Sequence, residues 1–146
     1  MKHLEDLFPG LRGTDCRVTS AADDRYNCIA WAAGVTAAWW WPLGAPAWST
    51  WPEGAPRAET LAAFQQAFLS LGFTPCPDGE LEAGQEKIAL FADEAGRPTH
   101  AARQLSTGRW TSKLGRLEDL EHDLRGLEGD AYGSVVLFLK RAAAAS

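Results

Sequence analysis

Hydrophobic periodicity in the first half of the chain predicts two helices. Between residues 60 and 71, large apolar side chains recur at helical spacing and share one face: Leu61, Phe64, Phe68 and Leu71. A shorter apolar run over 27–33 starts at Asn27, a good N-cap residue type, and ends before Gly34, which suits the left-handed C-terminal position. The first twenty residues show no regular pattern.

The second half of the chain changes to the alternation and short apolar runs that are typical of strands. Strands are expected over 87–92, 99–105, 109–113 and 134–141, and the segment 116–129 has the pattern of a short helix. Helices followed by a meander of strands predict an α+β fold, in which N-terminal helices pack on a small antiparallel sheet.

The turn at 106–108 sets the register of one predicted hairpin. A two-residue turn would require positive φ at Thr107, which a β-branched residue resists. A three-residue turn with Gly108 in the left-handed region avoids this and pairs Leu105 with Arg109. Ser112 then shares a strand face with His100, one diagonal step away.

The segment 35–56 holds five of the seven tryptophans and four of the eight prolines. Five indoles are costly to leave in water, so an ordered loop is expected rather than a flexible linker. Two interpretations stay open for its tryptophans. They pack the loop on the core, or they line a recognition groove.

Composition narrows the class of protein. The 146 residues carry a net charge of −5 and scattered basic residues, which argues against nucleic-acid binding. No apolar run approaches the ~20 residues of a membrane span, and acids interrupt the N-terminal apolar run, so neither membrane insertion nor a signal peptide is expected. We expect one domain over 1–146, with an ordered core at 18–141 and a frayed tail at 142–146.

The three cysteines, Cys16, Cys28 and Cys76, are an odd number for a secreted disulfide framework, so a reducing cytoplasm is the simpler expectation. They lack the spacing of a zinc site, and phosphate-binding glycine loops are absent, so no metal or cofactor is expected.

Cys28 is the candidate for chemistry because it begins the first predicted helix. A helix N-terminus stabilises a thiolate and would lower the pKa of this thiol, and its N–H groups could stabilise an oxyanion. His100, at the start of a predicted strand, is the candidate general base. The alternative is that Cys28 is a buried packing residue, since free cysteines are among the most buried residue types.

Several segments, in order and spacing, resemble a bacterial domain family of unknown function: "YNCIAWAAG", "WWWP", "EKIALFA", "HAARQL", "WTSKLG" and the later His122. The resemblance extends from about Val18 to Arg141. The chain also distantly resembles papain-like and NlpC/P60-type cysteine peptidases, which implies a papain-like fold.

Carried over residue by residue, the peptidase resemblance implies that Cys28 is the nucleophile, His100 the base and Ser112 the orienting residue. Asn27 and Tyr26 are candidates for the oxyanion donor that papain relatives take from an upstream glutamine. Trp31, Lys113 and His122 complete the expected substrate-binding surroundings.

These observations predict a cysteine hydrolase or acyltransferase that acts on an amide or related acyl bond of a protein, peptide or small amide. The alternative is a catalytically silent binding or interaction module whose tryptophan-rich loop recognises a partner.

Overall fold

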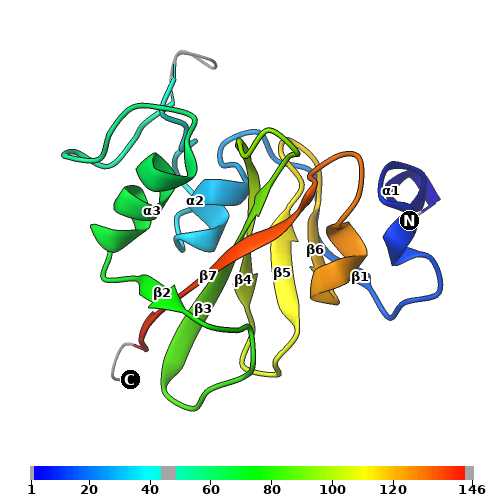
Figure 1. Cartoon of the computed structure of the whole chain (residues 1–146). Coiled ribbons are helices and arrows are strands. Elements are labelled where there is room, and N and C mark those ends of the chain that lie inside the picture. The colour runs from blue at the N-terminus through cyan, green and yellow to red at the C-terminus, as the bar shows by residue number, and fades with distance from the viewer. Residues whose placement is uncertain (1, 44–48, 144–146) are drawn as a thin grey trace.

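The computed structural model describes residues 2–43 and 49–143, and it centres on a large antiparallel sheet. The strands are β1 (Arg17–Ser20), β2 (Thr74–Cys76), β3 (Gln85–Ala92), β4 (Pro98–Gln104), β5 (Trp110–Lys113), β6 (Asp119–His122) and β7 (Ser134–Ala142). The helices are α1 (Lys2–Leu7), α2 (Cys28–Ala32) and α3 (Leu61–Leu69), with 3₁₀ turns η1 (Pro9–Leu11) and η2 (Leu124–Leu127). The seven strands follow the order β1-β6-β5-β4-β3-β7-β2 (Figure 1).

The expectation of an α+β, papain-like fold with N-terminal helices on a small sheet is wrong. The protein is largely β: within the described ranges its three α-helices have only six, five and nine residues. A strand, β1, also precedes α2, so the order of helices first and strands afterwards does not hold. The predicted helices exist, but they are too short to form a layer comparable with the sheet.

Local patterns explain which elements the sequence predicted and which it missed. The segment 116–129 forms β6 and η2 rather than a helix, because Leu120 and His122 alternate onto one buried face. All four residues of β1 are exposed, which removes any hydrophobic alternation. The three-residue β2 is an edge strand that contains Pro75, and proline is tolerated there because an edge strand has free N–H positions.

The two faces of the sheet bury separate hydrophobic clusters. Helices α2 and α3 cover the face that carries Leu90 and Ala101. Helix α1 and both 3₁₀ turns cover the opposite face, which carries Phe91 and Ala102 (Figure 1). Successive residues of a strand point to opposite faces, so neighbouring positions of β3 and β4 serve different clusters.

The register of β4 and β5 confirms the three-residue turn. The N–H of Leu105 donates to the carbonyl of Arg109, and Gly108 adopts a φ of 89°. In the part of the chain that the structure describes, the β4–β5 ladder ends at the Arg103–Thr111 pair. The residues of β4 before Arg103, which include His100, therefore lie beside β5 without regular backbone pairing. The candidate site lies where this pairing is interrupted.

The tryptophan-rich loop packs against the α2–α3 face. Trp39, Trp40 and Trp41 are each half-buried and Trp51 is buried, whereas Trp48 lies outside the described residues. The predicted tail starts too early, because Ala142 still pairs with Gln85 in the sheet, and 144–146 lie outside the described residues. None of the described helices has the length and apolar character needed to cross a membrane.

Candidate active site

Cys28 is the first residue of α2, and Asn27 fixes the start of that helix. The Asn27 Oδ1 atom accepts hydrogen bonds from the N–H of Ala30 at 3.2 Å and of Trp40 at 3.1 Å. Its Nδ2 donates to the carbonyl of Trp40 at 2.7 Å. The predicted N-cap is confirmed, but the Asn27 amide is committed to fastening the tryptophan-rich loop onto α2 rather than to an oxyanion.

The Cys28 thiol is buried and its pKa moves opposite to the expected direction. Burial raises this pKa to about 11, because desolvation disfavours the thiolate. The backbone N–H groups of Ala101, Ile29 and Cys28 itself favour the thiolate, but they are outweighed. The expected lowering of the pKa by the helix N-terminus therefore fails because the thiol is almost completely buried, and in this conformation the sulfur carries its proton at neutral pH.

His100 and Ser112 meet on one face of the sheet, as the hairpin register predicts. The Ser112 Oγ atom lies 2.9 Å from His100 Nε2 and 2.7 Å from His122 Nε2. His122 Nδ1 lies 2.8 Å from the backbone carbonyl of Asp123. These contacts form a continuous buried chain, and burial lowers the pKa of His122 to about 4 and the pKa of His100 well below 6.5.

The end of this chain fixes the position of every proton in it. A carbonyl only accepts, so His122 Nδ1 carries the hydrogen and, in the neutral ring, Nε2 is an acceptor. Ser112 therefore donates to His122, and its oxygen accepts from His100 Nε2–H. It follows that His100 Nδ1 holds no proton and presents a lone pair.

That lone pair has no hydrogen-bond partner among the described residues, although the atom is buried. Leaving a buried polar atom unpaired costs about 1–3 kcal/mol, and native proteins tolerate this mainly where the atom has a task. The ring itself is held firmly: Tyr132 stacks on it with centroids 4.1 Å apart, and Phe91 meets it edge-on at 5.0 Å. Tyr132 stands in no regular apolar pattern, so the sequence carried no signal for it.

Cys28 and His100 belong to opposite faces of β4. The His100 side chain leaves the strand on the Phe91 face, whereas α2 covers the Ala101 face. The thiol lies against the β4 backbone at the N–H of Ala101, one residue from His100. Tyr132 interacts with both groups. Its ring stacks on the imidazole, and a negative charge on Cys28 raises the pKa of its hydroxyl, although burial raises that pKa more. No hydrogen bond joins thiol and imidazole in this conformation, since His100 Nδ1 is unpaired.

The remaining predicted site residues hold the surrounding structure together. The buried Lys113 ammonium donates to three backbone carbonyls: Asp23, Gly115 at 2.6 Å and Leu117 at 2.7 Å. The Tyr26 hydroxyl donates to Asp119 at 2.9 Å, and the Trp31 indole donates to Thr111 at 3.2 Å. Their polar atoms are occupied within the fold, so the donors at the sulfur are the backbone N–H groups of Ala101, Ile29 and Cys28.

No three His, Cys, Asp or Glu side chains of the described ranges are grouped as metal ligands.

Comparison with known proteins gives a family match: a domain of unknown function (DUF7689) covers residues 17–140. Neither a curated protein nor a solved structure matches the chain.

Proposed function

The chain belongs to the DUF7689 family of domains of unknown function, and we propose that it is a cysteine-dependent hydrolase or acyltransferase in which Cys28 attacks and His100 is the base. One observation supports this most strongly. The Ser112–His122 chain holds His100 in the tautomer whose buried Nδ1 is unprotonated and unpartnered, and the Cys28 thiol lies against the backbone N–H of the next residue, Ala101. A histidine with only a packing role gains nothing from an unpaired lone pair in the core.

The proposed reaction moves one proton and exchanges one bond at each step. The resting structure has no hydrogen bond between thiol and imidazole, so the proposed reaction begins with a shift that brings the two groups together. The thiol proton then passes to His100 Nδ1 as the sulfur forms a bond to the acyl carbon. The imidazolium then returns the proton to the leaving amine or alkoxide as the acyl–N or acyl–O bond breaks. Water, or another amine, attacks the thioester with His100 again as base, which releases the acyl product and restores the thiol.

The site is closed in the resting protein, so substrate entry requires Tyr132 to shift from its position over His100. Cys28 and His100 are only 6% and 0% exposed. A substrate that displaces Tyr132 brings its own carbonyl to the sulfur and consumes the thiolate as it forms. The high thiol pKa of the closed form therefore describes the resting state, in which the pair is neutral.

A generic acyl donor tests the proposal without knowledge of the natural substrate. The protein is incubated with p-nitrophenyl acetate, nitrophenolate release is followed, and peptide mass spectrometry locates the acetyl group. We expect acetylation of Cys28, and a rate lowered at least ~10²-fold in His100→Asn because proton transfer is lost. Ser112→Ala should lower the rate less, since it frees the ring without removing the base.

His3→Asn is the matched control, because it makes the same substitution at an exposed position on α1. Urea midpoints of all variants show whether each remains folded. Acetylation confined to Cys16 and Cys76, or an unchanged Cys28 rate in folded His100→Asn, would contradict the proposal. The chain is then a silent binding module, the alternative that its tryptophan-rich loop suggests.

A further inference from the structure

Away from Cys28, the side chain of Arg103 on β4 is a half-buried cation that forms no ion pair with another of the described residues. Its Nε atom is buried and lacks a hydrogen-bond partner among the described residues. The guanidinium stacks over the Trp31 ring, 4.7 Å from its centroid, which fixes its plane. Burial lowers the pKa of Arg103. The nearby Glu86 and Asp119 charges raise this pKa, but by less than burial lowers it.

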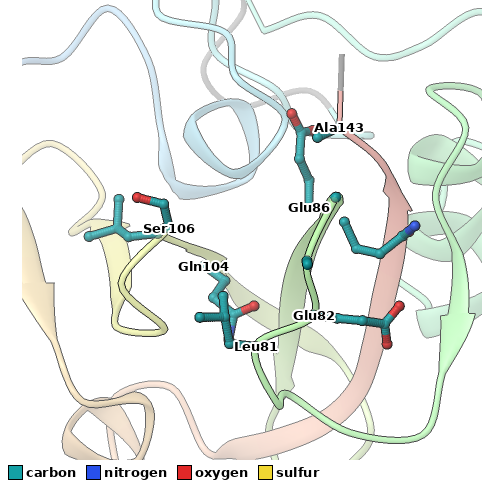
Figure 2. A pocket seen from close by; sticks show the side chains of 10 residues that line it. Leu81, Glu82, Glu86, Gln104, Ser106 and Ala143 are labelled. Atoms are coloured by element: carbon teal, nitrogen blue, oxygen red, sulfur yellow. The ribbon is translucent and has the colours of Figure 1, made fainter. Parts of the chain in front are cut away.

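Arg103 lines a hollow at the end of α2 that adjoins a larger one. The first measures about 280 Å³, and Arg141, Glu86 and Ser106 are also in its wall. The second measures about 620 Å³, and its apolar wall includes Leu81. Both hollows share four lining residues: Glu86, Gln104, Leu105 and Ser106. Figure 2 shows Gln104 and Leu81 of the larger hollow between Ser106 on one side and Glu82 and Glu86 on the other.

We propose that this double hollow binds a small monocarboxylate with an apolar tail, its carboxylate against the Arg103 guanidinium and its tail along Leu81 and Leu105. The planar fork of an arginine matches a carboxylate in geometry and charge. Such a ligand pairs its carboxylate with the part of the guanidinium that lines the smaller hollow, and its tail covers apolar surface in the larger hollow. The proposal does not depend on the activity proposed for Cys28.

The charges in the smaller hollow favour a single negative charge. Arg141 is already paired, because its Nε donates to Glu86 Oε2 at 2.6 Å. The charges of Arg141 and Glu86 balance each other, so Arg103 carries the excess positive charge in the wall of the smaller hollow. The Glu86 carboxylate in the same wall would repel a second negative charge, so a dianionic phosphate fits less well than a carboxylate.

Calorimetric titration of the whole protein tests the proposal with octanoate and its uncharged isostere 1-octanol. We expect octanoate to bind at least ~10-fold more tightly than octanol, because only the carboxylate makes charge-assisted hydrogen bonds. Raising the salt concentration should reduce this difference. Equal affinity of the two probes, or no binding of octanoate, would overturn the proposal without any variant.

Two variants locate the ligand. Arg103→Gln should weaken octanoate binding at least ~10-fold, whereas Arg97→Gln, the same change at an exposed turn, should leave it unchanged. Leu81 is 54% exposed, so Leu81→Asp should fold and should weaken octanoate binding by repulsion and lost apolar contact. Unchanged affinity in Leu81→Asp, or equal losses in the two arginine variants, would show that octanoate binds elsewhere.

Discussion

Mild acid should destabilise this protein because folding keeps two buried histidines neutral. His100 and His122 are completely buried, and burial lowers the pKa of both rings. In the unfolded chain they regain an ordinary pKa near 6.5 and take up protons. Below that pH the unfolded state binds more protons than the folded state, so stability rises with pH and falls on acidification.

The size of the effect follows from His122 alone. Its pKa falls from 6.5 to about 4 on folding, so its contribution is complete above pH 6.5 and is lost between pH 6.5 and 4. At pH 5 linkage gives a loss of about 2 kcal/mol relative to neutral pH. His100 is shifted in the same direction and adds to this loss. Asp23 adds little at pH 5, because its pKa is lowered from 3.8 to about 2 on folding and its contribution is lost only at lower pH.

Urea unfolding followed by tryptophan fluorescence at several pH values between 5 and 7.5 measures the loss. His122→Gln should flatten the pH dependence, although it lowers stability at neutral pH, and His3→Gln is the exposed control. A free energy of unfolding that is constant between pH 5 and 7 would refute the reasoning. So would a His122 ring that titrates near 6.5 in the folded protein by NMR.

Other substitutions test the framework around the site, each by its free energy of unfolding in urea. Lys113→Met should cost roughly 1–3 kcal/mol, because three partly buried backbone carbonyls lose their charged donor. Asn27→Ala should cost about 1–2 kcal/mol as the cap and the link to the tryptophan-rich loop are lost. Gly133→Ala should destabilise strongly, since the new Cβ would overlap the Ala92 carbonyl, whereas Gly96→Ala at similar φ meets open space and should cost only about 1–2 kcal/mol.

Local patterns predicted the elements that position the site. Asn27 as a cap, the left-handed Gly108 and the register that puts Ser112 beside His100 all follow from short-range stereochemistry, and all three are confirmed. The hairpin argument worked because only one turn length spares Thr107 a strained backbone. Residues 134–141 were predicted as a strand from apolar content alone, and β7 includes them.

The missed features depend on tertiary context. The leucines around Leu120 recur every three or four residues, which fits a helix, and only the position of this segment between β1 and β5 in the sheet decides for a strand. The direction of the Cys28 pKa shift could not be predicted, because a helix N-terminus and burial oppose each other and sequence does not reveal how completely the thiol is covered. The stacking of Tyr132 on His100 likewise joins segments 32 residues apart.

The burial of Cys28 and His100 also raises the energy of proton transfer in the proposed reaction. With a thiol pKa of about 11 and an imidazole pKa well below 6.5, the thiolate–imidazolium form lies roughly 6 kcal/mol or more above the neutral pair. The chain beyond His100 offsets part of that cost. His100 donates to Ser112, Ser112 donates to His122, and His122 donates to the Asp123 carbonyl. Each acceptor in this chain therefore directs a lone pair toward the positive charge that forms on His100. A hydroxyl can therefore serve as the orienting group, because His122 and a backbone carbonyl fix the direction of its proton.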